Sequence, residues 1–178
     1  MQFLFALFCL LFPILSHAAQ SPDNCVIVGV IDGDTVTARC GDRGAHEQIR
    51  VRLHGIDAPE KRQAYGMRAK QVLSGMVFGK PARLDCLNID RYARRVCKVM
   101  VAPASAPGGP QTLDAGLAML TVGMAWWYRS YAGEQSPEER GRYEFAEFEA
   151  KSRRAGLWRD PQPLAPWSWR KAEHAGPR

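Results

Sequence analysis

The chain has 178 residues, which is enough for one folded domain with a sizeable core and too few for two. Hydrophobic residues make up 46% of it and charged residues 24%, the proportions of an ordinary soluble globular protein. The formal net charge of +6 favours acidic partners, either nucleic acid or an anionic membrane face.

The first residues, Met1 to Ala18, have the composition of a signal peptide. The stretch from Phe3 to Leu15 is almost wholly apolar but too short for a comfortable membrane span. Small residues precede the expected cleavage point after Ala18. No Lys or Arg precedes the apolar stretch, which leaves an uncleaved anchor open. We expect a secreted or periplasmic protein, monomeric and without stable membrane association after cleavage.

A β-hairpin is predicted over residues 25–39. β-branched residues flank the Asp32-Gly33 dipeptide, which is a strong signal for a hairpin turn. The next residues, 49–54, alternate between apolar and basic side chains, the period of a half-buried strand. The apolar side of this strand would face the core and its basic side a groove or water.

The middle of the chain is predicted to contain one helix and two further strands. Apolar residues at helical spacing predict a helix over residues 63–78, which the Gly79-Lys80-Pro81 sequence ends. Residues 82–87 and 95–101 supply the strands.

The second half is predicted to be mainly helical. A surface loop rich in Pro and Gly at residues 102–110 precedes a helix over residues 113–122. Another helix is predicted over residues 136–156, with Ser136 as its N-cap. Residues 157–178 are rich in Pro and Trp, and we expect an extended segment with a loose end.

Four cysteines remain after the signal segment, and four allow three pairings. Cys25 and Cys40 lie at equal distances from the Asp32-Gly33 turn, and Cys86 and Cys97 flank Arg91-Tyr92 in the same way. Bridges within each pair are therefore favoured, as an oxidising compartment allows. Four unconnected thiols are the alternative, and the absence of C-x-x-C spacing disfavours a zinc site.

About five short strands with about three helices predict an α+β fold that is mainly β. We expect a five-stranded Greek-key barrel of the oligonucleotide/oligosaccharide-binding (OB) type over residues 19–170, followed by a loose tail at residues 171–178. An SH3-like barrel or another α+β fold is the alternative.

Three carboxylates and two arginines lie near the ends of predicted strands. A barrel can bring Asp34 and Asp57 to one rim, where oxygen ligands suit a hard cation such as Ca²⁺. The planar side chains of Arg52 and Arg94 can each grip phosphate oxygens. Glu60 can orient or deprotonate a water molecule. These are the components of metal-assisted phosphodiester cleavage.

Cations and aromatic rings are interleaved at Arg91-Tyr92 and over residues 126–131. This pattern suits stacking on bases and contact with phosphates. The two adjacent tryptophans of the second stretch cannot face the same way, so at least one is expected in the core. We take Arg91, Tyr92 and Tyr131 as candidates for substrate binding.

The motifs of this chain, taken together and in order, resemble those of the staphylococcal nuclease (thermonuclease) family, whose domain is an OB barrel. The matching motifs are Ile31-Asp-Gly-Asp-Thr35, Val51-Arg-Leu-x-Gly-Ile-Asp-Ala-Pro-Glu60, Asp90-Arg-Tyr-Ala-Arg94, Gly123-Met-Ala-Trp-Trp-Tyr-Arg-Ser-Tyr131, Gly156-Leu-Trp158 and Pro166-Trp-x-Trp169. The resemblance covers the chain from about Val26 to Arg170.

The resemblance implies specific roles for the site residues. By this resemblance, the ligands for Ca²⁺ would be Asp34, Asp57 and the backbone carbonyl oxygen of Ala58. Its phosphate-binding groups would be Arg52 and Arg94, with Glu60 as general base or water-positioning group.

Two departures from the family pattern affect these expectations. Gly116 stands where an Asn commonly opens the second helix, and we expect it to act as a weak cap. Arg129 replaces a tyrosine, which puts base stacking at that position in doubt.

The predicted function is a Ca²⁺-dependent endonuclease that acts on DNA and RNA. The resemblance implies cleavage of the 5′ P–O bond, which leaves 3′-phosphate ends. One alternative is a non-catalytic nucleic-acid-binding barrel, against which the complete set of charged site residues argues. Another is a nuclease with a restricted substrate.

Overall fold

The computed structural model describes residues 24–175, so the predicted signal peptide lies outside the described residues. The strands are β1 (Cys25–Val30), β2 (Thr35–Cys40), β3 (Glu47–Leu53), β4 (Ile56–Asp57), β5 (Pro81–Ile89), β6 (Arg95–Val101), β7 (Leu113–Asp114) and β8 (Trp126–Trp127). The helices are α1 (Gly66–Val77), α2 (Ala115–Thr121), α3 (Pro137–Ser152) and α4 (Pro166–His174), with 3-10 helices at Arg129–Glu134 and Gly156–Arg159.

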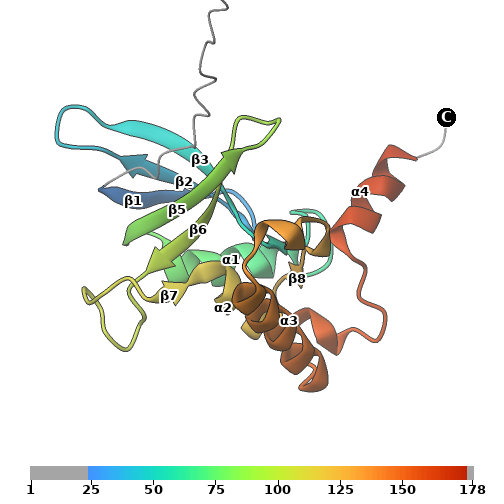
Figure 1. The fold of residues 1–178 in the computed structure, drawn as a ribbon. Helices are drawn as coiled ribbons and strands as arrows, with labels where there is room; N and C mark the ends of the chain where they lie inside the picture. The colour runs from blue at the N-terminus through green and yellow to red at the C-terminus, as the bar shows by residue number, and fades with distance from the viewer. Residues whose placement is uncertain (1–23, 176–178) are drawn as a thin grey trace, which may run out of the picture.

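Five of the strands close into a barrel (Figure 1). The sheet order is β3-β2-β1-β5-β6-β7, and its neighbours are antiparallel. β3 also pairs with β6 in parallel, with Val51 opposite Arg95, and this pairing joins the two sides of the sheet. The predicted α+β fold, mainly β and built on a five-stranded OB barrel, is confirmed.

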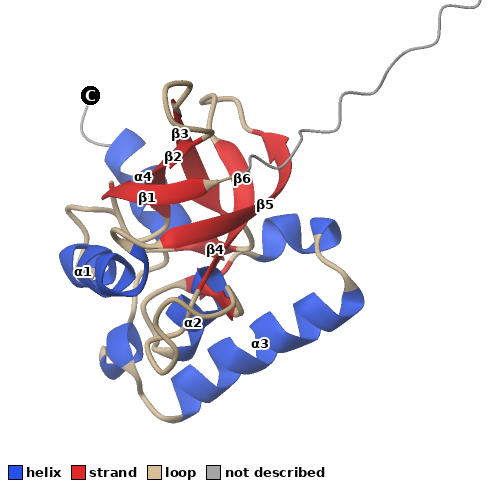
Figure 2. Ribbon diagram, turned by 90° about the vertical axis from the view of Figure 1, so that its left-hand side faces the viewer, coloured by secondary structure: helices blue, strands red, loops and turns tan. Residues whose placement is uncertain are grey.

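The core fills the barrel and continues beneath the helices. Alternate residues of the strands point inward, and Ile27, Val36 and Val51 are fully buried. Helix α1 contributes Leu73 to the same core. Figures 1 and 2 show α1, α2 and α3 gathered at one end of the barrel. Within residues 24–175 no helix is both long and apolar enough to cross a membrane.

The alternation expected for residues 49–54 holds through Leu53, the last residue of β3. Ile49, Val51 and Leu53 are buried and Arg50 is exposed, but His54, expected on the polar side, is only 3% exposed. The expectation for His54 was wrong because the chain turns inward after β3, where His54 N donates to Cys97 O (2.9 Å).

Helices α1 and α2 begin later than the sequence pattern indicates. The expected start of α1 at Gln63 is wrong because residues 60–66 form two successive turns and Tyr65 has a positive φ of 66°. The expected cap at Gly116 is also wrong. Asp114 caps α2, and its carboxylate accepts hydrogen bonds from the N–H groups of Gly116 (2.9 Å) and Leu117 (3.2 Å).

Helix α3 begins as predicted and ends earlier. Ser136 and Glu139 form a capping box, which confirms the predicted N-cap. The helix ends at Ser152 rather than near Gly156, because Arg154 adopts a left-handed conformation (φ 50°) and Ala155 N donates back to Ala150 O (2.9 Å).

The C-terminal part was expected to be extended with a loose end from residue 171, and this is wrong where the structure describes it. Residues 166–174 form α4, which begins with Pro166 at a favourable first-turn position. The ring of Trp167 stacks on Tyr128, with centroids 5.8 Å apart. This contact between distant parts of the chain stabilises a helix that is too short to be stable alone.

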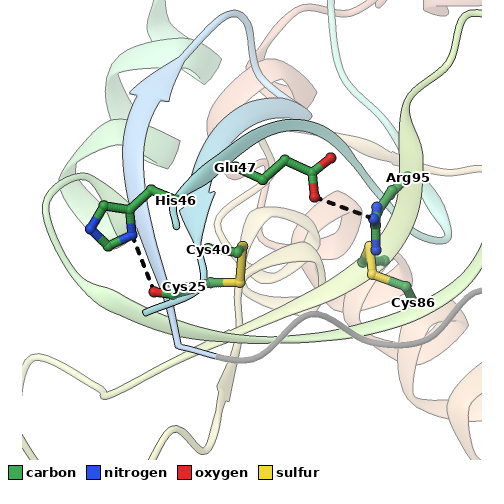
Figure 3. Close-up of a disulfide and its surroundings, with 8 residues drawn as sticks. Cys25, Cys40, His46, Glu47, Cys86 and Arg95 are labelled. Atoms are coloured by element: carbon green, nitrogen blue, oxygen red, sulfur yellow. Dashed lines mark hydrogen bonds and ion pairs between the residues drawn. A yellow bond between two sulfur atoms is a disulfide. The ribbon is translucent and has the colours of Figure 1, made fainter. Parts of the chain in front are cut away.

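Two disulfides tie strands of the barrel together (Figure 3). They pair Cys25 with Cys40 and Cys86 with Cys97, the pairs that the cysteine spacing predicts. Cys86 and Cys97 are direct partners in the register of β5 and β6. Each bridge therefore crosslinks neighbouring antiparallel strands whose connecting turn carries a candidate site residue.

Reduction of both disulfides should lower the stability of the fold. The bridges close loops of 15 and 11 residues, for which the chain-entropy model gives at most about 3 kcal/mol each. Unfolding in denaturant, with and without reductant, measures the change. Peptide mapping of the unreduced protein checks the pairing, and a peptide that joins Cys25 or Cys40 to Cys86 or Cys97 would contradict this register.

Candidate active site

The turn between β1 and β2 places Asp34 at the rim of the barrel. Ile31 N donates to Thr35 O (2.8 Å), and Asp34 N donates to the side chain of Asp32 (3.1 Å), so the turn is fixed by its own hydrogen bonds. The Asp34 carboxylate also accepts from Ala58 N (2.8 Å), just beyond β4. This bond joins the two motifs that carry the predicted metal ligands.

Gly33 lets this turn approach the rest of the site closely. A Cβ at this position would lie 2.6 Å from the Cβ of Ala58 and 2.7 Å from the Cβ of Ala69 in α1. A side chain there would push the turn outward. The glycine of the Asp-Gly-Asp motif is therefore required by packing.

Arg52 lies between the two aspartates. One guanidinium nitrogen, Nη1, lies 2.6 Å from Asp34 Oδ2, and the other, Nη2, lies 2.9 Å from Asp57 Oδ1. All three residues are largely buried, since their side chains are 13%, 9% and 1% exposed. A planar guanidinium that spans two carboxylates fixes both in position.

Glu60 lies in the loop between β4 and α1, beside the same carboxylates. Its backbone N–H donates to the side chain of Gln63 (3.0 Å), which sets the turn. Its Oε1 accepts from Arg170 Nη1 (2.7 Å), and the same arginine pairs with both oxygens of Asp57. The structure thus brings Glu60 together with the predicted metal ligands.

The burial of several charged groups close together shifts their pKa values. Burial, together with the charge of Asp34, raises the pKa of Asp32 to about 6. Burial acts to lower the pKa of Arg52, but the charges of Asp34 and Asp57 outweigh it and raise that pKa above its ordinary value. Arg52 is therefore a permanent cation at the centre of an acidic cluster.

The turn between β5 and β6 carries the other predicted binding groups. The carboxylate of Asp90 accepts from the backbone N–H groups of Tyr92 (2.9 Å) and Arg94 (3.0 Å) and from Arg94 Nε (2.8 Å). The guanidinium groups of Arg91 and Arg94 lie 5.1 and 5.3 Å from the ring centre of Tyr92. Arg94 is held by Asp90 of its own turn in this structure.

One cleft of about 850 Å³ connects these groups. Its lining includes the residues predicted for catalysis, metal binding and substrate binding: Asp34, Arg52, Asp57, Ala58, Glu60, Arg91, Tyr92, Arg94 and Tyr131. The structure therefore brings the predicted set to one concave surface, although Arg94 is paired with Asp90.

The aromatic stretch contributes mainly to the core. Trp126 and Trp127 are 7% and 6% exposed, so both tryptophans are buried. Arg129 pairs with the buried carboxylate of Glu147 (2.9 Å) and lies over the ring of Trp127 (4.5 Å). Tyr131 is half exposed and remains available at the cleft.

The site offers oxygen ligands of the kind that Ca²⁺ prefers. Asp34 and Asp57 point at one shared cation, the Arg52 guanidinium, which shows that their oxygens converge. Among residues 24–175, no group of three or more His, Cys, Asp or Glu side chains is arranged to hold a metal ion. The convergent oxygens of Asp34 and Asp57 are of the type that a hard cation takes as ligands.

Arg170 is a further residue of this site that was not predicted from the sequence. It lies in α4, 113 residues beyond Asp57. The available signal was the sequence Pro166-Trp-Ser-Trp169, because a proline at a helix start followed by large aromatic side chains indicates a helix that packs on the body.

The close approach at Gly33 gives a test of the site's packing. Gly33→Ala should lower the free energy of unfolding by about 1 to 3 kcal/mol, as overpacking a tight contact does. The matched control is Gly75→Ala in α1, where a Cβ meets nothing within 4 Å and should stabilise by roughly 0.5 to 1 kcal/mol. Urea unfolding measures both, and equal stability of the two variants would contradict the packing.

Comparison with known proteins gives a consistent picture. The family model of staphylococcal nuclease homologues matches residues 50–160. The chain is 42% identical over 145 residues to Protein ParB of Escherichia coli, which covers 82% of this chain and 77% of that protein. It is 40% identical over 160 residues to a micrococcal nuclease of Shigella flexneri, with coverage of 89% and 87%.

A third relative is an uncharacterized endonuclease of Haemophilus influenzae, 36% identical over 164 residues, with coverage of 92% of this chain and 82% of that protein. The residues matched by the family model include Arg52, Asp57, Glu60 and Arg94, and they end before Arg170. The match to the family model and the length and identity of these alignments lead to one conclusion: the chain belongs to the staphylococcal nuclease homologue family.

Proposed function

We propose that this protein is an exported Ca²⁺-dependent endonuclease that hydrolyses phosphodiester bonds of DNA and RNA as a monomer. One observation carries the proposal: Arg52 bridges Asp34 and Asp57 at the rim of the barrel, with Glu60 beside them in the same cleft. Two relatives are named as a micrococcal nuclease and an endonuclease, which supports the reaction class.

Asp34, Asp57 and the carbonyl oxygen of Ala58 are the residues we propose to hold Ca²⁺. Bound Ca²⁺ would supply positive charge that polarises the phosphate and makes water a better nucleophile. The carboxylates of Asp34 and Asp57 converge on one cation in this structure, which supports this assignment.

The other site residues supply the general base and the groups that stabilise charge on the phosphate. Glu60 accepts a proton from the attacking water, and the guanidinium groups of Arg52 and Arg94 donate hydrogen bonds to the phosphate oxygens as charge builds on them. The water oxygen bonds to phosphorus as the bond to the 5′ oxygen breaks. The 5′ oxygen leaves as a hydroxyl after taking a proton from solvent, and the phosphate stays on the 3′ oxygen. For this step Arg94 exchanges its contact with Asp90 for the substrate.

The surroundings of the cleft suit a nucleic acid. Tyr92 and Tyr131 are 62% and 50% exposed and offer rings for base stacking, while Arg91 offers a charge to a neighbouring phosphate. Two disulfides and the N-terminal segment of signal-peptide composition support an oxidising location outside the cytoplasm.

Metal dependence is the first test. Cleavage of plasmid and single-stranded DNA should require Ca²⁺, and Mg²⁺ should substitute poorly because its octahedral shell releases water reluctantly. Gel analysis with Ca²⁺, with Mg²⁺ and with excess chelator measures this. Full activity in chelator would overturn the metal assignment.

Substitutions at the site test the chemistry. Arg52→Lys, Arg94→Ala and Glu60→Gln should each lower turnover on the order of a hundredfold, because each removes a group that acts in the transition state. Arg83→Ala is the matched control, since Arg83 pairs with Asp85 on the exposed surface of β5 and does not line the cleft. Circular dichroism checks that each variant is folded.

The same variants separate the enzyme from its alternative. A non-catalytic nucleic-acid-binding barrel would bind DNA without cutting it. The contradicting result is that both Glu60→Gln and Arg94→Ala keep turnover within about threefold of the unaltered protein, whereas the loss of a transition-state contact would lower turnover by much more. That result would leave the binding module as the better account.

A further inference from the structure

We infer that Arg170 is a positioning residue of the active site, and that the C-terminal helix α4 serves to deliver it. The inference rests on the proposed function, because its target is the proposed general base, Glu60. Figure 1 shows α4 beside the loop that connects β4 to α1, the loop that carries Glu60.

Arg170 makes the contacts that fix the carboxylate of Glu60. Its Nη1 lies 2.7 Å from Glu60 Oε1 and 3.2 Å from Asp57 Oδ1, and its Nη2 lies 2.8 Å from Asp57 Oδ2. Asp57 is itself rigid, because it is buried, belongs to β4 and is held by Arg52. The guanidinium therefore ties a carboxylate on a loop to a carboxylate on the barrel.

Such a tie matters because Glu60 is otherwise free to rotate. Its side chain is 36% exposed and stands on a long flexible stem. A general base acts only from within hydrogen-bond distance of the proton that it takes. Small displacements of such a group are costly to the rate, so a residue that holds it contributes to turnover without touching the substrate.

The fold anchors α4 firmly enough for this role. Trp167 stacks on Tyr128 and packs edge-on against Trp126, with centroids 5.8 and 6.4 Å apart. Trp126 is in turn the register partner of Asp57 in the small sheet formed by β4 and β8. The helix that carries Arg170 is thus packed on the strand that pairs with Asp57.

A second contact ties the same loop to the C-terminal segment. Gln63 is 7% exposed and accepts a hydrogen bond from the backbone N–H of Glu60 (3.0 Å). Its amide donates to the carbonyl oxygen of Leu164, just before α4. Both the backbone and the side chain of Glu60 are therefore held by residues that come from, or bond to, the C-terminal segment.

The test compares Arg170→Met with a matched control, Lys171→Met, which removes one exposed positive charge from the same helix. In steady-state cleavage of single-stranded DNA with Ca²⁺, Arg170→Met should lower kcat about 10- to 100-fold, the usual effect of losing a supporting contact. KM should change less than about threefold, because the contact is made to the protein and not to the substrate. The kcat of Arg170→Lys should fall between those of Arg170→Met and Lys171→Met. Lysine keeps the positive charge but loses the two-pronged hydrogen bonding of the guanidinium.

A double-mutant cycle identifies the target of Arg170. In the Glu60→Gln background, adding Arg170→Met should lower kcat by less than about twofold, because residues that act as one unit are not additive. A multiplied loss, or a change confined to KM, would overturn the positioning role and assign Arg170 to direct contact with the substrate.

Hydrogen exchange gives a measurement that does not depend on activity. The backbone amides of residues 58 and 60–63 should exchange at least about fivefold faster in Arg170→Met than in Lys171→Met, because a released loop opens more often. Equal exchange in the two variants would overturn the inference even if the enzyme cleaves DNA. Absence of cleavage by the unaltered protein, with faster exchange in Arg170→Met, would instead count against the proposed function alone.

Discussion

The ion pairs between Arg52 and the two aspartates are the interaction on which the site depends. Asp34 comes from the β1–β2 turn and Asp57 from β4, so a buried guanidinium between them joins two separate parts of the barrel. A buried charge without partners is strongly destabilising, so each member of this cluster requires the others. The same bonds that hold the rim together orient the oxygens that suit a cation.

Strand pairing, a disulfide and a packed helix hold this cluster in place. The parallel pairing of β3 with β6 closes the barrel directly beside Arg52, whose register partner is Val96. The Cys86–Cys97 bridge lies one residue further along β6 and crosslinks it to β5. On the other side, β8 pairs with β4, and α4 packs on Trp126 of β8 and pairs with Asp57 through Arg170. The candidate site residues on turns are thereby held by strands and a helix that are bonded to one another.

Local features of the sequence were sufficient to predict much of this. The Asp32-Gly33 turn, the Ser136 cap and the cysteine spacing each depend on residues that are near one another in the chain. Contacts across long separations were not predictable in the same way. Arg129 binds buried Glu147 and Arg170 binds Asp57 because the tertiary fold brings their segments together. Neither pair leaves a periodic or spaced pattern in the sequence.

Titration calorimetry of Ca²⁺ with the folded protein tests the central claim most directly. The unaltered protein should bind one Ca²⁺ per chain, and Asp57→Asn should abolish this binding because it removes a buried ligand. Asp85→Asn is the control, since Asp85 is an exposed partner of Arg83 outside the cleft. Undiminished binding by a folded Asp57→Asn variant, or no binding by the unaltered protein, would contradict the account.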